Sequence, residues 1–96
     1  MSEICTITTV RGALDAGSRC VGFYHDFEKA CDVVQRNICD INEMGYYPYA
    51  VIEVVGEGIY AYPRKEFWYK WNHDTERYED CPKPEKFKQV VGWSVG

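Results

Sequence analysis

Hydrophobic and polar residues alternate in short stretches near the start of the chain, as they do in strands. Residues 4–10, "ICTITTV", are rich in β-branched types and alternate between two faces, which predicts a strand. Residues 19–25 predict a second strand that pairs antiparallel with the first. Gly22 within it indicates either a bulge or the close approach of another backbone. Residues 11–18, which join the two strands, contain Gly12 and Gly17 and predict a loop.

The apolar positions change to a helical period in residues 26–44. Steps of three and four residues separate them, which predicts a helix with one apolar face against a sheet. Asp26 favours the helix start and Gly45 the stop. Because Asn37 and Asp40 are poor helix formers, we expect a kink or a break there. The apolar stripe consists of Phe27, Ala30, Val34, Ile38 and Ile41.

The second half of the chain predicts further strands. Residues 50–55 are nearly all apolar, which is typical of a central strand that is covered on both faces or only partly wet on one. Pro48 favours the start of this strand. After the "GEG" turn, residues 59–63 predict its hairpin partner. Residues 66–71 and 76–81 predict another hairpin, joined through "NHDT", and a short helix is expected after Pro84.

The order β-β-α-β-β-β-β, with the short terminal helix, predicts an α+β fold in a single domain of residues 1–96. One main helix would cover one face of an antiparallel sheet, and the other face would stay open. Side chains alternate across a strand, so Phe67, Tyr69 and Trp71 should share one face. Trp68 and Lys70 should share the other face.

Composition and charge narrow the classes of partner. The net charge of -4 and the pI near 5.1 disfavour binding to duplex nucleic acid or to anionic membranes. No apolar run approaches the ~20 residues of a membrane span, and no secretory signal is visible, so we expect a cytosolic protein. The five cysteines are odd in number and lack CxxC spacing, which predicts free thiols.

Metal and catalytic patterns are weak in this sequence. The spacing of Cys20, His25 and Cys31 matches no common zinc site, and His73 lies far away, so we expect neither metal nor cofactor. The chain lacks the glycine-rich motifs that cradle phosphates, and no cysteine stands beside an evident activating group. A protein that binds without catalysing is therefore expected.

Aromatic residues are concentrated in residues 59–78, which hold four of the eight tyrosines and two of the three tryptophans. Rings next to cations can hold a base by stacking and a phosphate by charge-assisted hydrogen bonds. The same rings are also typical of a core or a subunit interface. Since a small core cannot hide 15 aromatic residues, we expect a homo-oligomer. The ring-and-cation set is Tyr60, Tyr62, Arg64, Trp68, Tyr69 and Lys70.

Residues 19–63, "RCVGFYHDFEKACDVVQRNICDINEMGYYPYAVIEVVGEGIYAYP", are followed by "FWYKWN" and the closing "KPEKFKQVVGWSVG". The chain resembles a group of short, mostly uncharacterised proteins of phages, prophages and gut Firmicutes. The motifs that carry this resemblance are above all "VGFY", "FEKA", "YAVIE", "GIYAYP" and "WYKWN". The likeness covers about residues 19–96. It implies a bacterial host cytosol and a phage setting, in which small proteins often counter host defence.

This resemblance leaves three interpretations. In the first, the protein is an anti-defence protein that sequesters a nucleotide-derived immune signal without catalysis; its rings stack on the base, and Arg64, Lys70 or Arg19 takes the phosphate. In the second, exposed rings and acidic residues dock directly on a host defence enzyme, as an inhibitor. In the third, the protein is a host regulatory or interaction module.

Overall fold

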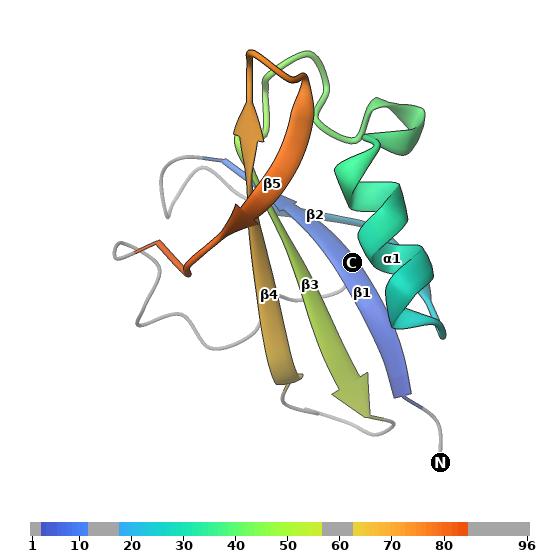
Figure 1. Ribbon diagram of the computed structural model, residues 1–96. Helices are drawn as coiled ribbons and strands as arrows, with labels where there is room; N and C mark the ends of the chain where they lie inside the picture. The colour runs from blue at the N-terminus through green and yellow to red at the C-terminus, as the bar shows by residue number, and fades with distance from the viewer. Residues whose placement is uncertain (1–2, 12–17, 57–62, 85–96) are drawn as a thin grey trace.

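The computed structural model describes residues 3–11, 18–56 and 63–84 (Figure 1). In this part of the chain, one α-helix packs on an antiparallel sheet with the strand order β2-β1-β3-β4-β5. The predicted α+β class, with one main helix on an antiparallel sheet, is confirmed. The elements are β1 (Glu3–Val10), β2 (Ser18–Tyr24), α1 (Phe27–Gln35), the 3-10 helix η2 (Ile38–Asp40), β3 (Tyr49–Gly56), β4 (Pro63–Asn72) and β5 (Arg77–Cys81).

β1 and β2 form the antiparallel pair that the sequence predicts, and the pair contains a bulge. Ile7 lies opposite Gly22, whereas Thr8 lies opposite Cys20, so Val21 is the extra residue. A Cβ atom built on Gly22 would meet no other atom within 4 Å. Gly22 therefore adjoins a bulge and does not mark the close approach of another backbone.

α1 begins where an acidic side chain caps its first turn. The carboxylate of Asp26 accepts hydrogen bonds from the backbone N–H groups of Glu28, at 2.9 Å, and Lys29, at 3.4 Å. These bonds satisfy two donors that the helix itself leaves without partners. Ala30 and Val34, one helical turn apart, are fully buried against the sheet.

The helix predicted over residues 26–44, with its stop at Gly45, is too long, whereas the break expected within it is confirmed. α1 ends at Gln35, and Asn37 then adopts a left-handed conformation with φ of 51°. Asp40 is also left-handed, with φ of 53°, so the chain cannot continue as an α-helix to residue 44. The short helix η2 follows Asn37 and ends at Asp40.

Two apolar clusters lie on opposite faces of the sheet. Alternation along β4 places Phe67, Tyr69 and Trp71 on the α1 side and Trp68 on the other side, as predicted. The cluster under α1 contains Cys5, Ile7, Ala30, Val34, Ile41, Ala50, Ile52, Tyr69 and Tyr78. The cluster on the opposite face contains Val10, Val51 and Trp68.

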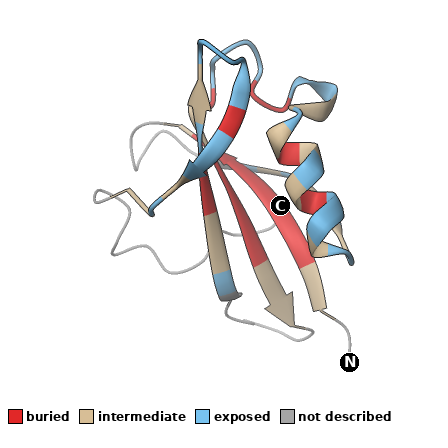
Figure 2. Ribbon diagram, viewed as in Figure 1, coloured by how far each residue is buried: buried red, intermediate tan, exposed pale blue. Residues whose placement is uncertain are grey.

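The expectation that this second face stays open is wrong for the central strands. Residues 5–10 of β1 and residues 50–53 of β3 are all buried (Figure 2). Because successive residues point to opposite faces, an unbroken buried run requires cover on both faces. On the second face, even the polar side chains of Thr8 and Glu53 are only 0% and 1% exposed. The two alternatives for residues 50–55 are thus decided for residues 50–53, which are covered on both faces.

The predicted hairpins need one correction. β3 pairs with β4, with Tyr49 opposite Lys70 and Val55 opposite Pro63, so the strand predicted to begin the second hairpin is also the partner of β3. The second hairpin, β4 with β5, is confirmed, with Trp71 opposite Tyr78. The predicted strand at residues 59–63 lies almost wholly outside the described residues, as do the terminal helix and tail at residues 85–96.

Within the described ranges, no helix has both the length and the apolar character needed to cross a membrane.

Candidate ligand-binding site

The two described rings of the predicted aromatic platform, Trp68 and Tyr69, do not share a surface. Trp68 is 4% exposed and packs with Val10 and Val51, whereas Tyr69 is 3% exposed and belongs to the cluster under α1. Both rings also use their polar atoms internally. The indole N–H of Trp68 donates to Glu66 Oε1 at 3.1 Å, and the Tyr69 hydroxyl donates to the Cys31 thiol at 3.3 Å. Burial raises the pKa of Tyr69.

The cations predicted to bind phosphate are also separated. Lys70 on β4 and Arg19 on β2 are exposed, but β1 and β3 lie between them, which sets them about 14 Å apart. Arg19 is held elsewhere by an ion pair of 3.2 Å with Glu43. Tyr60, Tyr62 and the side chain of Arg64 lie outside the described residues. The described members of the predicted set therefore share no site.

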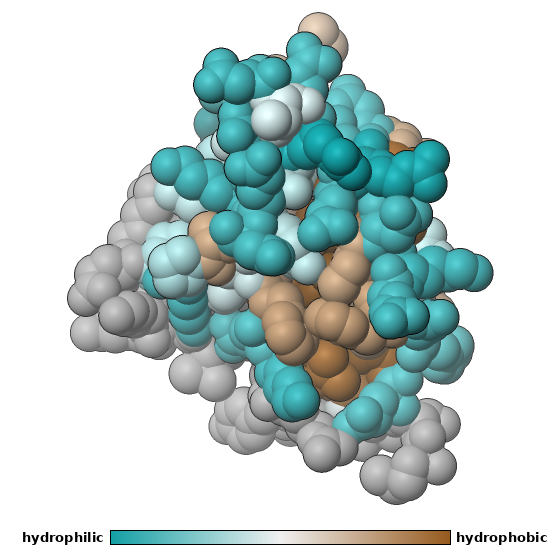
Figure 3. Space-filling view, viewed as in Figure 1, coloured by the Kyte–Doolittle hydropathy of each residue, from teal (hydrophilic) through white to brown (hydrophobic). Residues whose placement is uncertain are grey.

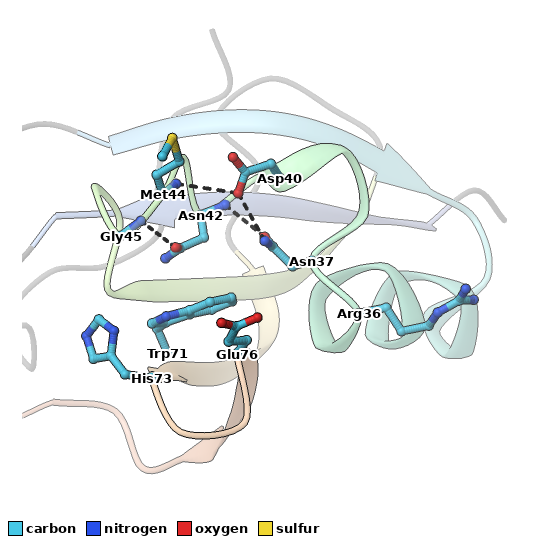
Figure 4. Close-up of a pocket in the computed structure, with 9 residues that line it drawn as sticks. All are labelled: Arg36, Asn37, Asp40, Asn42, Met44, Gly45, Trp71, His73 and Glu76. Atoms are coloured by element: carbon cyan, nitrogen blue, oxygen red, sulfur yellow. Dashed lines mark hydrogen bonds between the residues drawn. The ribbon is translucent and has the colours of Figure 1, made fainter.

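A different site lies where the chain between α1 and β3 meets the β4–β5 turn. The space between them, which we call the hairpin hollow, has a volume of about 400 Å³ (Figure 4). Hydrophilic side chains surround this end of the molecule, whereas apolar ones gather beside α1 (Figure 3). One wall consists of Arg36, Asn37, Asp40, Asn42, Met44 and Gly45, and the other of Trp71, His73 and Glu76.

The backbone around the hairpin hollow is unusually rich in left-handed residues. Five of its nine lining residues have positive φ: Asn37 at 51°, Asp40 at 53°, Met44 at 59°, Gly45 at 97° and Glu76 at 56°. Asn, Asp and Gly tolerate this conformation, but a left-handed Met or Glu costs roughly 1–2 kcal/mol. Strained backbone of this kind clusters at functional sites more than elsewhere. Both walls of the hollow contain a left-handed residue with this cost in free energy, Met44 in one and Glu76 in the other.

A buried asparagine fixes the first wall. Asn42 is 1% exposed, and its amide nitrogen donates to the Tyr47 carbonyl at 2.7 Å and to the Tyr78 hydroxyl at 3.2 Å. Its amide oxygen accepts from the Gly45 N–H at 2.6 Å, and its own N–H donates to Asn37 Oδ1 at 2.9 Å. Every polar group of Asn42 is thus used within the protein. Its role in the hollow is to hold the shape of the wall.

Asp40 contributes to the same wall. Its Oδ1 accepts hydrogen bonds from the Asn37 side-chain amide, at 3.1 Å, and from the Met44 N–H, at 3.4 Å. Met44 itself is 94% exposed, so its side chain stands at the surface beside the hollow and not in the core. These bonds keep a left-handed segment ordered before any ligand arrives, which lowers the entropic cost of binding.

The second wall comes from the hairpin turn, which is also fixed by hydrogen bonds. Asn72 Oδ1 accepts from the N–H groups of Asp74, at 2.8 Å, and Thr75, at 3.4 Å. The Glu76 N–H donates to the Asn72 carbonyl at 2.8 Å. The Trp71 N–H donates to the carbonyl of Pro48 at 2.8 Å, which joins the hairpin to the start of β3.

Three side chains on this wall have unused hydrogen-bonding capacity. The Trp71 indole packs edge-on against Tyr78, with ring centroids 5.1 Å apart, and is only partly buried. Its N–H group makes no hydrogen bond to any described residue. The side chains of His73 and Glu76 are exposed and likewise contact no described residue through a hydrogen bond or ion pair. An aromatic surface, an imidazole and a carboxylate therefore face the hollow, ready for a ligand.

The charge around the hollow is acidic. Asp40 and Glu76 carry negative charge, and Arg36 is the single cation among the lining residues. Arg36 is itself engaged with Asp32 through an exposed ion pair of 3.2 Å. This balance favours a ligand that offers N–H donors to the interior of the hollow. Anionic groups would be better accommodated outside the hollow, since the Arg36 side chain points away from the other lining residues (Figure 4).

A second hollow, also of about 400 Å³, lies beside the middle of β4 and the end of β5. Two of its polar side chains are already paired: Glu66 Oε1 accepts from the Trp68 indole and forms an ion pair of 3.2 Å with Lys83. The Cys81 thiol lies in the same hollow, and burial raises its pKa, which lowers its reactivity as a nucleophile. This second hollow therefore has fewer unengaged hydrogen-bonding groups for a ligand than the hairpin hollow has.

The cysteines in the described ranges are free thiols, as expected. Cys5 is buried, and burial raises the pKa of its thiol. Within the described part of the chain, no three His, Cys, Asp or Glu side chains come together as a possible metal site.

The sequence does not predict the hairpin hollow, although it predicts parts of it. It identified the break at Asn37 and Asp40 and the turn that contains His73, but it placed Trp71 on the core face. A half-buried ring that serves both core and surface has no distinct pattern in a sequence.

Comparison of the chain with models of protein families, with curated proteins and with solved structures finds no match.

Proposed function

We propose that this protein binds a nucleotide-derived signalling molecule in the hairpin hollow and holds it unchanged, as a phage protein that counters a host defence. The observation that carries this proposal is the partly exposed indole of Trp71 in a preformed hollow of about 400 Å³. This volume lies in the range of small-molecule sites, roughly 300–1,000 Å³. Stacking of a base on an aromatic side chain contributes about 1–3 kcal/mol.

The chemistry is the same as that of the predicted aromatic platform, but other residues supply it. Trp71 replaces Trp68 as the stacking surface, and Arg36 replaces Arg64, Lys70 and Arg19 as the cation near the phosphate. A nucleotide would place its base in the hollow and direct its phosphate outside it. The phage setting rests on the resemblance of residues 19–96 to phage and prophage proteins.

Binding without conversion is supported by the arrangement of the reactive groups. Nucleophilic catalysis requires a nucleophile within hydrogen-bonding distance of a base that a third group orients. Among the described residues that line the hollow, His73 and Glu76 are not hydrogen-bonded to each other or to a nucleophile. The hollow offers recognition groups, and a sequestering protein needs no more.

The proposal is tested by calorimetric titration of the purified protein with a panel of nucleotides that includes cyclic and ADP-ribose-derived forms. We expect at least one to bind at micromolar concentration or tighter. Heat denaturation should then release that nucleotide with its mass unchanged. Absence of binding across the panel would contradict the proposal, and a chemically altered nucleotide would make the protein an enzyme.

Direct docking on a host defence protein is the second candidate, and one observation favours it. Phe23 on the edge strand β2 is 56% exposed, and Val21 beside it is 37% exposed. Exposed aromatic anchors often dominate protein interfaces. Pull-down from a host lysate with the wild-type protein and with Phe23→Ser tests this candidate. A defence protein retained by the wild type and lost from the variant would support docking through β2.

A further inference from the structure

We propose that the hairpin hollow selects guanine, and that the carboxylate of Glu76 reads the Watson–Crick edge of the base. The proposal rests on the proposed function and names the chemistry of its ligand. Glu76 and Trp71 stand on the same wall of the hollow, so a base stacked on the indole would present an edge to the carboxylate (Figure 4).

The backbone of Glu76 is fixed, and its exposed carboxylate is unengaged within the described part of the chain. Its backbone is left-handed, with φ of 56°, and its N–H is bonded to the Asn72 carbonyl at 2.8 Å. Its carboxylate accepts no hydrogen bond from a described residue, whereas the neighbouring Glu79 carboxylate accepts from Asn72 and Thr75. A costly backbone conformation thus holds an unengaged carboxylate at the wall.

A carboxylate has two acceptor oxygens and no donor. Guanine matches it with two adjacent donors, N1–H and the N2 amino group, so both oxygens can be used at once. Adenine presents one amino donor beside the lone pair of N1, which would repel the second oxygen. Hypoxanthine keeps N1–H but lacks the amino group. A bidentate contact of this type gives a discrimination between bases of about 5- to 150-fold.

The charge of the hollow points in the same direction. Asp40 adds a second carboxylate, and Arg36 is shared with Asp32 at 3.2 Å. A base that offers donors is therefore stabilised in the interior, and a long phosphate chain is not. We expect guanosine ligands with few phosphates to bind best.

Titration calorimetry with GMP, AMP and IMP tests the selectivity. In the wild-type protein, we expect the affinity for GMP to exceed the affinity for AMP and for IMP by about tenfold or more. Glu76→Gln should remove most of this preference, because an amide offers one acceptor and one donor. Asp74→Asn is the matched control: it removes the same charge from the same turn, but Asp74 does not line the hollow, so the preference should remain.

Each result has a distinct meaning. Equal affinity of the wild type for GMP and AMP would overturn the guanine assignment and leave nucleotide binding in place. Retention of the preference in Glu76→Gln would overturn the role of Glu76. If none of the three nucleotides bound and the wider panel also failed, both the selectivity and the proposed function would be contradicted. Circular dichroism of both variants verifies that they are folded.

Discussion

Trp68 and Trp71 lie three residues apart on β4 and therefore on opposite faces of the sheet. Trp68 is 4% exposed and donates its indole N–H to Glu66, whereas Trp71 lines the hairpin hollow and packs against Tyr78. Trp68 is thus a core residue and not an exposed platform, whereas Trp71 packs against the core, as expected, and also lines the hollow.

Substitution of the two tryptophans separates these roles. We expect Trp68→Ala to lower the free energy of unfolding by about 3–5 kcal/mol, because it leaves a cavity beside Val10 and Val51. Trp71→Ala should cost less stability, since its ring is already partly exposed, but should abolish nucleotide binding. Urea unfolding and titration calorimetry measure the two effects. Weaker binding in Trp68→Ala than in Trp71→Ala, with both folded, would restore the platform predicted from sequence.

Two glycines test the cost of left-handed backbone beside the hollow. A Cβ atom would meet nothing within 4 Å at either Gly45 or Gly22, but only Gly45 has a positive φ, of 97°. We expect Gly45→Ala to lower the free energy of unfolding by about 1–2 kcal/mol. Gly22→Ala, the matched control, should be neutral or stabilise by up to about 1 kcal/mol. Equal effects in urea unfolding would show that φ at Gly45 carries no cost.

The raised pKa of the Tyr78 hydroxyl leads us to expect that the protein loses stability at alkaline pH. Burial raises the pKa of its hydroxyl to about 12, above the value of ~10 for an exposed tyrosine. The neutral phenol therefore contributes stability that is complete below about pH 10 and is lost as the pH rises through about 12. We expect the free energy of unfolding to fall by about 2–3 kcal/mol across this window on account of Tyr78.

Tyr78→Phe should reduce this alkaline loss, as urea unfolding at pH 9 and pH 11.5 would show. At pH 9 it should cost only about 1 kcal/mol, because Asn42 and the Tyr47 carbonyl remain bonded to each other at 2.7 Å. Tyr46→Phe is the control, since Tyr46 is 49% exposed. An unchanged pH dependence in Tyr78→Phe would contradict the assignment to Tyr78.

Self-association through β2 is the last prediction. β2 is an edge strand of the described sheet and presents Phe23 and Val21 to solvent, whereas the other edge, β5, exposes the charged residues Arg77, Glu79 and Asp80. Charged edges resist pairing, and apolar edges invite it. Light scattering coupled to size exclusion should give a mass above the 11.2 kDa of one chain. Phe23→Ser should shift it toward the monomer; a monomeric wild type would contradict the expected homo-oligomer.

The sequence by itself determined the local features of this fold. Asp26 caps α1, the left-handed Asn37 follows its end, and the alternation along β4 sets Trp68 and Trp71 on opposite faces. Each of these features depends on a few neighbouring residues, because capping, left-handed backbone and strand alternation are properties of short segments.

Only the tertiary structure decided which faces are covered and where a ligand could enter. Alternation tells which residues share a face but not which face is buried, since burial depends on segments far apart in the chain. Residues 36–48 and the β4–β5 hairpin meet through the contacts of Asn42 with Tyr78, at 3.2 Å, and of Trp71 with Pro48, at 2.8 Å. No sequence pattern in either segment predicts contact with the other, so the hollow between them exists only once the chain has folded.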